Sequence, residues 1–160
     1  MSVVVTGSAG FLGRALVAEL VSRGVTVIGV DRNPRVSGDH LALTGDLLHR
    51  DEMVDVALDT ADAVVHLAGC PGVRDTAADV ERRRRRDNVA ATARVLDAVP
   101  ARVPVVVASS SSVYGGSRGR PSRETDAVAP RGGYARSKMA VEALCARRAA
   151  AGGRVTVVRP

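Results

Sequence analysis

The sequence predicts an α/β fold, a doubly wound parallel sheet of about six strands with helices on both faces. Short, nearly continuous apolar runs rich in valine alternate along the 160 residues with longer helical patterns. Such runs are typical of parallel strands that are buried on both faces. The first run also leads into a glycine-rich turn that opens a helical pattern. The sequence contains no repeats and no inter-domain linker, so we expect residues 1–160 to form one domain.

Each element is predicted from a local pattern. The first helix has leucines at positions 12, 16 and 20 and stops at Gly24, while the last helix stops at Gly152 and Gly153. The valine-rich runs are bounded by polar and glycine-containing turns, as strands are. The expected strands are residues 3–5, 25–30, 41–44, 63–67, 103–108 and 155–158, and the expected helices are residues 12–23, 50–58, 78–99 and 134–150.

The glycine-rich turn after the first strand has the spacing of a dinucleotide-binding loop. Gly7 would allow the tight turn, Gly10 would let the backbone approach a pyrophosphate, and Gly13 would let the helix pack closely on the strand. The helix N-terminus then offers free N–H groups and the positive end of its dipole to the anion. The alternative is an ordinary strand-to-helix turn.

The second strand ends in an acid, Asp31, at the distance from the glycines that suits the hydroxyl groups of an adenosine ribose. A carboxylate there repels a 2′-phosphate, so NAD is predicted in preference to NADP. Arg32 and Arg35 lie nearby and oppose this preference. The alternative role for Asp31 is that of a turn or helix cap.

Ligands of such sheets bind beyond the carboxyl ends of the strands. Small or polar residues follow the third, fourth and fifth predicted strands there: Asp46, Ala68, Gly69, Ser109 and Ser110. Each alone is more often a turn residue, and only their joint placement at one edge predicts a site. His66, at the end of its strand, is interpreted as a packed structural histidine.

The composition restricts the function further. The net charge is +6, but three aromatic residues are too few for the base stacking typical of nucleic-acid binding, so phosphate-bearing small molecules are the expected partners. No apolar run reaches the length of a membrane span. Cys70 and Cys145 have no metal-ligand spacing, so no metal site is expected, and free thiols favour a cytoplasmic location.

The most specific signal is the pair Tyr134 and Lys138. Lys138 is the one lysine among 23 lysine and arginine residues, and it lies four residues after one of two tyrosines. On a helix this spacing puts the phenol and the ammonium on one face. A nearby cation favours the phenolate and so lowers the pKa of a tyrosine, which is otherwise about 10. The alternative is a surface lysine beside a packed tyrosine.

Together these motifs make the chain resemble the extended short-chain dehydrogenase/reductase family, which includes nucleotide-sugar epimerases and dehydratases. Residues 6–13 are similar to its TGxxGFxG loop, and Tyr134 to Lys138 are similar to its YxxSK segment. Further similar segments are Asp46-Leu47, the HLAG segment at 66–69, the NVxGT-like segment at 88–92 and the SSxxVYG-like segment at 109–115.

The resemblance implies a Rossmann-like cofactor domain and a role for each matching residue. Tyr134 would be the general base, Lys138 would lower the pKa of Tyr134 and hold the nicotinamide ribose, and Ser110 would bond the reacting sugar oxygen. The resemblance also implies a homodimer and a nucleotide-sugar substrate, and the family's C-terminal substrate domain is absent from these residues. The implied cofactor-binding residues are Gly7, Gly10, Phe11, Leu12, Gly13, Asp31, Arg32, Asp46, Leu47, Leu67, Ala68, Gly69, Asn88, Ser109, Tyr134 and Lys138.

Several functions remain open at this point. The first is an NAD-dependent nucleotide-sugar epimerase or its cofactor-binding domain, and residues 70–74 are similar to a segment of uronate epimerases. The second is a non-catalytic NAD(P)-binding sensor or half-length relative. A dehydratase, decarboxylase or reductase acting on nucleotide sugars is a further alternative. Ser111 and Ser112 stand where a 4,6-dehydratase has an acid pair, which counts against that reaction. A nucleic-acid-binding module has only the net charge in its favour.

Overall fold

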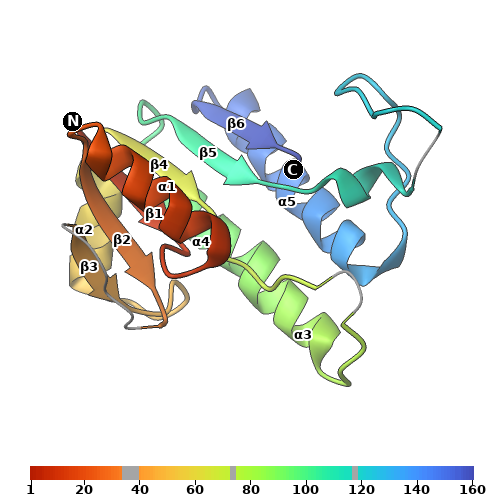
Figure 1. The fold of residues 1–160 in the computed structure, drawn as a ribbon, viewed down its shortest axis with the longest axis horizontal. Coiled ribbons are helices and arrows are strands. Elements are labelled where there is room, and N and C mark those ends of the chain that lie inside the picture. Colours follow the sequence, from red (N-terminus) through yellow and green to blue (C-terminus); the bar gives the residue numbers. More distant parts are fainter. Residues whose placement is uncertain (34–39, 73–74, 117–118) are drawn as a thin grey trace.

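The computed structural model describes residues 1–33, 40–72, 75–116 and 119–160. Over these residues the chain forms one sheet of six parallel strands in the order β3-β2-β1-β4-β5-β6 (Figure 1), which confirms the predicted fold class. The strands are β1 (Ser2–Thr6), β2 (Thr26–Asp31), β3 (Leu41–Thr44), β4 (Ala63–His66), β5 (Val105–Ala108) and β6 (Val155–Val158). The helices are α1 (Phe11–Ser22), α2 (Glu52–Thr60), α3 (Val80–Arg84), the π-helix η1 (Arg85–Ala90), α4 (Ala91–Ala98), the 3-10 helix η2 (Ser111–Tyr114) and α5 (Gly132–Ala150).

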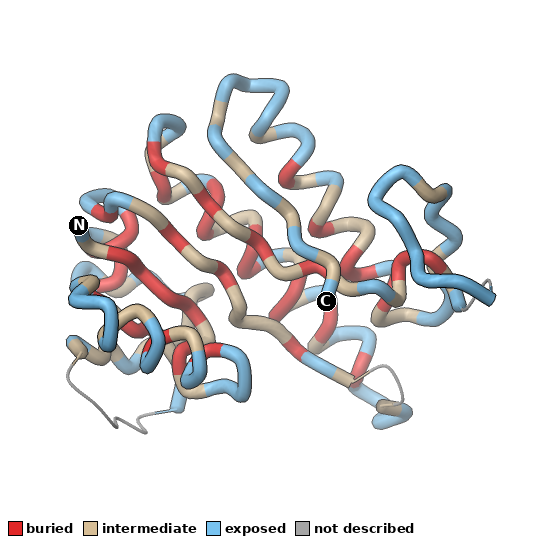
Figure 2. Tube along the Cα trace, turned by 45° about the horizontal axis from the view of Figure 1, so that its top comes forward, coloured by how far each residue is buried: buried red, intermediate tan, exposed pale blue. Residues whose placement is uncertain are grey.

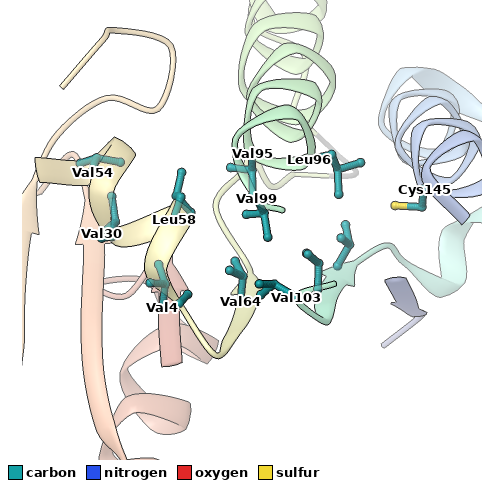
Figure 3. Packing of buried hydrophobic residues seen from close by; sticks show 14 of the residues in the cluster. Val4, Val30, Val54, Leu58, Val64, Val95, Leu96, Val99, Val103 and Cys145 are labelled. Carbon is teal, nitrogen blue, oxygen red and sulfur yellow. The ribbon is translucent and has the colours of Figure 1, made fainter. Parts of the chain in front are cut away.

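Helices cover both faces of the sheet. Because side chains alternate along a strand, Val4 points to one face and its neighbours Val3 and Val5 point to the other, and all three are buried. Val3 and Val5 pack with Val17 of α1. On the opposite face α2, α4 and α5 pack on the sheet and form the larger core cluster, which includes Val4 of β1 and Leu58 of α2 (Figure 3). Buried segments therefore run along the central strands (Figure 2).

The strand order reverses between β1 and β4, which are neighbours in the sheet. The register pairs Thr6 with both Val30 and His66, so the three strands end together at one edge. In doubly wound sheets the ligand crevice lies at this reversal. No helix in the part of the chain described is both long enough and apolar enough to cross a membrane.

The long helix predicted over residues 78–99 differs most from expectation. It begins at Val80, ends at Ala98 and is interrupted by the π-helical turn η1. A π-turn inserts extra backbone into the helix and is common at functional sites. Here it contains two buried polar residues, Asp87 and Asn88.

The run of five arginines at residues 82–86 predicts a solvated helix face, and this prediction is wrong at Arg84. That side chain is buried, and its guanidinium donates hydrogen bonds to the carbonyl oxygens of Gly72 (2.7 Å) and Asp75 (3.3 Å) and to the Glu81 carboxylate. Arg84 therefore stabilises the backbone before α3 by hydrogen bonds and does not point into solvent.

The sequence also predicts a polar turn after Asp31, through Asn33, Pro34 and Gly38. Positions 34, 35 and 38 lie outside the described residues.

Arg148 of α5 fastens the end of α4 to the sheet. Its guanidinium donates to the carbonyl oxygens of Leu96 (2.7 Å), Val99 (2.9 Å), Pro100 (2.8 Å) and Val103 (3.3 Å). The last carbonyl groups of a helix have no partner within the helix, so a side chain that satisfies them stabilises the end.

We expect Arg148→Met to lower the free energy of unfolding by about 2–4 kcal/mol, because it leaves part-buried carbonyl groups without donors. Denaturant titration monitored by circular dichroism measures the loss. The exposed neighbour supplies the control, since Arg147→Met should change the free energy by less than about 0.5 kcal/mol. Equal effects of the two substitutions would contradict the capping role.

Candidate active site and cofactor cleft

The glycine loop lies between β1 and α1 and has the shape predicted from its glycines. Gly7 has φ +72°, and a Cβ on it would lie 2.6 Å from the backbone nitrogen of Ala68. A Cβ on Gly13 would collide with the carbonyl oxygen of Gly7. Gly10 is the N-cap of α1, and neither a capping side chain nor an acidic residue occupies the first turn. The N-terminus of α1 is therefore open to an anion.

A cleft with about 590 Å³ of unfilled space lies beside this loop, at the strand reversal. Apolar side chains and carboxylates share its walls, as a nucleoside requires. The predicted residues that line it are Gly7, Gly10, Asp31, Arg32, Asp46, Leu47, Leu67, Ala68 and Gly69. Sequence reasoning missed Val30, Gly45, Asp87 and Ala91, which line it too.

Other predicted cofactor residues lie outside these walls. Phe11 and Leu12 are on the first turn of α1 with 85% and 51% of their surface exposed. Gly13 is buried beneath the loop, so its part is to let α1 approach. Ser109 donates a hydrogen bond to Glu142 (2.5 Å). The role in cofactor binding given to Phe11 and Leu12 stays a prediction.

Asp31 joins the glycine loop to the end of β2. One carboxylate oxygen accepts the N–H of Ala9 (3.0 Å), and the other accepts the N–H of Asn33 (2.9 Å). Each oxygen retains a second lone pair, so the carboxylate can still accept a hydroxyl group. Asp31 therefore combines the alternative role of a turn cap with a place in the cleft wall.

Asp46 is held in its ionised form. Burial by itself raises the pKa of this carboxyl group, but the hydrogen bonds from the Leu48 N–H and from Arg86, with the charges of Arg86 and Arg32, lower the pKa overall. An ionised carboxylate accepts hydrogen bonds and donates none. Asp46 can thus accept N–H or O–H groups from a ligand in the cleft.

A buried hydrogen-bond chain runs from β1 to the π-turn through His66. The Thr6 hydroxyl lies 2.7 Å from His66 Nδ1, and His66 Nε2 lies 3.0 Å from the Thr92 hydroxyl, which donates to the carbonyl oxygen of Asn88 (2.6 Å). Because the Thr92 hydroxyl donates its proton to the Asn88 carbonyl, it can only accept from His66. His66 Nε2 therefore donates to Thr92, and Nδ1 accepts from Thr6. Burial, with the charge of Lys138, lowers the pKa of His66 to about 3. His66 is therefore neutral and structural, as interpreted from the sequence.

The Asn88 side chain links this hydrogen-bond network to α5, the helix that contains Tyr134. Its Oδ1 accepts the N–H of Cys70 (2.7 Å), and its Nδ2 donates to Ser137 Oγ (2.9 Å) and to the Cys70 carbonyl (3.3 Å). Ser137 in turn donates to the backbone oxygen of Tyr134 (2.7 Å). Asn88 thus positions the loop after β4 against the first turn of α5.

The predicted catalytic residues converge from two elements. Ser110 is the N-cap of η2 after β5, while Tyr134 and Lys138 lie one turn apart on α5. Ser110 hydrogen-bonds with the Tyr134 phenol, and the Lys138 ammonium lies 5.9 Å from the centre of its ring. Lys138 is buried and donates to the carbonyl oxygen of Ala108 (2.9 Å).

The electrostatics of Tyr134 differ from expectation. Burial raises the pKa of its phenol, and the hydrogen bond from Ser110 and the charge of Arg84 oppose this rise only in part. The Lys138 ammonium gives one of its three N–H groups to the Ala108 carbonyl, and burial lowers the pKa of the ammonium. The expected lowering of the Tyr134 pKa by Lys138 is thus not present in this arrangement. Sequence reasoning missed Arg84 because its burial depends on the backbone carbonyl groups of Gly72 and Asp75, which only the folded chain brings to it.

A second network, also missed, ties the strand ends to α5. Arg159 donates to both carboxylate oxygens of Glu142 (2.8 and 2.6 Å) and to the Tyr114 hydroxyl (2.8 Å). The Ser109 hydroxyl donates to the same carboxylate. The Arg159 guanidinium also lies 5.0 Å from the centre of the Tyr114 ring. This network fixes η2, and with it the position of Ser110.

Comparison with known proteins places the chain in a family. The model of the NAD-dependent epimerase/dehydratase family matches residues 3–160. The chain belongs to this family. Membership confirms the resemblance drawn from the glycine loop and the Tyr134 to Lys138 segment, and NAD is the cofactor on which this enzyme family depends.

Three similar proteins indicate the range of the family. The solved structure of MoeE5 with UDP-glucuronic acid and NAD is 40% identical and superimposes with a TM-score of 0.86, over 98% of this chain and 52% of MoeE5. An uncharacterized UDP-glucose epimerase, YtcB, of Bacillus subtilis (strain 168) is 32% identical over 91% of this chain and 51% of its own length. A UDP-N-acetyl-α-D-glucosaminuronate decarboxylase of Bacillus cytotoxicus is 34% identical over 98% and 52%. The chain therefore spans about half the length of these relatives.

The neutral state of His66 predicts a pH dependence of folding. Its folded pKa of about 3 lies below the unfolded value of 6.5, so the unfolded chain binds the extra proton first as the pH falls. This effect is negligible above the unfolded pKa and should remove about 2 kcal/mol of unfolding free energy between pH 7 and pH 5. Denaturant titrations at both pH values measure the change.

His66→Gln should remove this part of the pH dependence, because glutamine does not titrate. The exposed histidine provides the matched control, and His49→Gln should leave the pH dependence unchanged. The same pH dependence in the wild-type chain and the His66→Gln variant would show that folding leaves the pKa of His66 unchanged and would contradict the neutral, buried imidazole.

Proposed function

We propose that the protein is an NAD-dependent nucleotide-sugar epimerase and that these 160 residues form its cofactor-binding part. The observation that carries this proposal is the convergence of Ser110, Tyr134 and Lys138 beside the cleft at the glycine loop. A binding protein without catalysis has no need of a serine hydrogen-bonded to a tyrosine beside a buried lysine. The convergence therefore favours an enzyme over the non-catalytic sensor.

The residues of the cleft suit NAD. The uncapped N-terminus of α1 and the backbone of Gly7 and Gly10 would hold the pyrophosphate, and Asp31 and Asp46 would accept ribose and adenine donors. Bound NAD supplies a hydride acceptor. Its positively charged nicotinamide would also lower the pKa of Tyr134, which burial raises in this structure.

The protein groups then handle the proton of the reaction. Tyr134, as phenolate, would take the proton from a sugar hydroxyl, and bound NAD would supply the hydride acceptor that oxidation of the same carbon to a keto group requires. Ser110 would donate a hydrogen bond to the reacting oxygen, and Lys138 would bond the nicotinamide ribose. Tyr134 would return its proton to that oxygen when the carbon is reduced from the opposite face, so the product is an epimer of the substrate and no atoms are lost.

Nucleotide sugars are the proposed substrates. Supporting relatives are YtcB, described as a UDP-glucose epimerase, and MoeE5, whose structures hold UDP-glucuronic acid or UDP-glucose with NAD. The net charge of +6 suits a diphosphate ligand. Two free, buried cysteines are consistent with the proposed cytoplasmic location.

Decarboxylation of a nucleotide sugar acid is the second candidate. It is favoured by the similarity to the Bacillus cytotoxicus decarboxylase, and it would begin with the same oxidation by Tyr134 and NAD. Ser111 and Ser112 continue to count against a 4,6-dehydratase. The product distinguishes the candidates, since only the decarboxylase releases carbon dioxide.

If Tyr134 is the base, Tyr134→Phe should lower the rate of epimerisation by about 10²–10⁴-fold, because positioned acid–base groups contribute about this much. The affinity for NAD should change little, since one hydroxyl group is lost. The rate is measured with UDP-glucose and UDP-glucuronic acid in a form of the protein as long as its relatives. NAD affinity is measured by calorimetry on residues 1–160.

The other tyrosine provides a matched control for this test. Tyr114→Phe removes the same hydroxyl group and one hydrogen bond to Arg159, which keeps both bonds to Glu142, so it should lower the rate far less than Tyr134→Phe does. An active protein that is indifferent to Tyr134→Phe would refute the assignment of Tyr134 as the base. A protein that binds NAD but turns over neither sugar would leave the sensor.

The homodimer is proposed on the helix pair formed by α4 and α5. A groove between α3, η1 and α5 has Val89 and Ala140 in its lining, where small side chains let two copies approach across a two-fold axis. Its other lining residues include Glu81 and the arginines 82, 84, 85 and 136. Light scattering at micromolar concentration should give twice the mass of the chain. Ala140→Arg should yield monomers, whereas Ala149→Arg, at an exposed position of the same helix, should not. A wild-type monomer would contradict the proposal.

A further inference from the structure

A network of four charged side chains forms one wall of the cofactor cleft. Arg32 places its two terminal nitrogens on the two carboxylate oxygens of Asp87, at 3.2 and 3.3 Å. Arg86 donates to Asp87 (2.7 Å) and pairs with Asp46. Arg32 also lies 3.9 Å from Asp46. Two arginines therefore share two carboxylates at the mouth of the cleft.

The pair of Arg32 and Asp87 bridges two elements that face each other across the cleft. Arg32 follows Asp31 at the end of β2, whereas Asp87 comes from the π-turn η1, and both residues line the cleft. The Asp87 side chain is 10% exposed and the Arg32 side chain 52%. Asp87 is thus the fixed partner, and its position decides where the arginine points.

We propose that Asp87 determines cofactor selectivity by holding Arg32 in this two-point pair, which keeps the guanidinium away from a 2′-phosphate and so favours NAD over NADP. The inference rests on the proposed cofactor role of the cleft. An arginine next to the ribose-binding acid is the group that would otherwise accept the 2′-phosphate, because a guanidinium binds phosphate through two parallel hydrogen bonds. In this structure the same two nitrogens are engaged by Asp87.

The charge of the cleft wall acts in the same direction. The cleft wall carries three carboxylates and two guanidinium groups, which leaves one net negative charge beside the position expected for the ribose. The carboxylates are those of Asp31, Asp46 and Asp87, and the guanidinium groups are those of Arg32 and Arg86. A 2′-phosphate brings up to two more negative charges and is repelled. The preference for NAD, predicted from Asp31 alone, is thus assigned to Asp31 and Asp87 together.

The test is the ratio of the dissociation constants of NADP and NAD, measured by calorimetry on residues 1–160. Asp87→Asn keeps the shape of the side chain, removes one negative charge and releases Arg32. The ratio should fall by roughly tenfold, which corresponds to about 1.4 kcal/mol. A general loss of structure would weaken the binding of both cofactors and leave the ratio of their dissociation constants unchanged. The ratio therefore separates an effect on selectivity from an effect on stability.

Further variants assign the effect to Arg32. The double variant Asp87→Asn, Arg32→Gln should lose the gain in NADP affinity, because the freed guanidinium is then absent. Asp55→Asn is the matched control, since Asp55 pairs with Arg94 outside the residues that line the cleft, and it should leave the ratio unchanged.

Two results would overturn the inference. The first is an unchanged ratio in a folded Asp87→Asn protein. The second does not depend on that variant and is a tenfold loss of NADP affinity on Arg32→Gln in the otherwise unchanged chain. Such a loss would show that Arg32 already reaches the phosphate. Failure of the unaltered chain to bind either cofactor would instead refute the proposed function.

Discussion

The rest of the site depends on the two hydrogen bonds of the neutral His66 imidazole. The imidazole links Thr6, directly before the glycine loop, to Thr92 and through it to the π-turn. Each hydroxyl group has one proton to donate, so the chain is satisfied in one direction only. A buried polar group without its partner costs on the order of 1–3 kcal/mol, so such a network is either complete or strongly destabilising. The cofactor edge of the sheet is thereby fixed relative to the helix behind it.

The π-turn η1 connects this edge of the sheet to both ends of the proposed site. Its distortion turns two consecutive side chains inward, and they serve different ends of one ligand site. Asp87 reaches the adenosine end through Arg32, while Asn88 reaches the catalytic end through Cys70 and Ser137. A regular α-helix over residues 80–98 offers no extra backbone to provide both contacts. The irregularity thus couples cofactor choice to the placement of the Tyr134 helix.

The sequence predicted the sheet, the glycine loop and the convergence of Ser110, Tyr134 and Lys138, because strand periodicity, glycine spacing and the i,i+4 rule act over short distances. It did not predict the pairing of Arg32 with Asp87 or of Glu142 with Arg159. Those partners are 55 and 17 residues apart, and only the folded chain brings them together. The burial of Arg84 was missed for the same reason, since a charge run by itself indicates a solvated face.

Lys138 gives the protein an unusual chemical property. It is the single lysine of the chain, and 8% of its surface is exposed in the folded state. A protease that cleaves only after lysine therefore has one target, at the catalytic centre, and must wait for α5 to open before it can cut. When opening is fast relative to cleavage, the cutting rate reports the open population of that helix. Lys138 and the amino terminus are the two primary amines of residues 1–160, so acylation beyond one label per chain counts the molecules in which Lys138 is accessible.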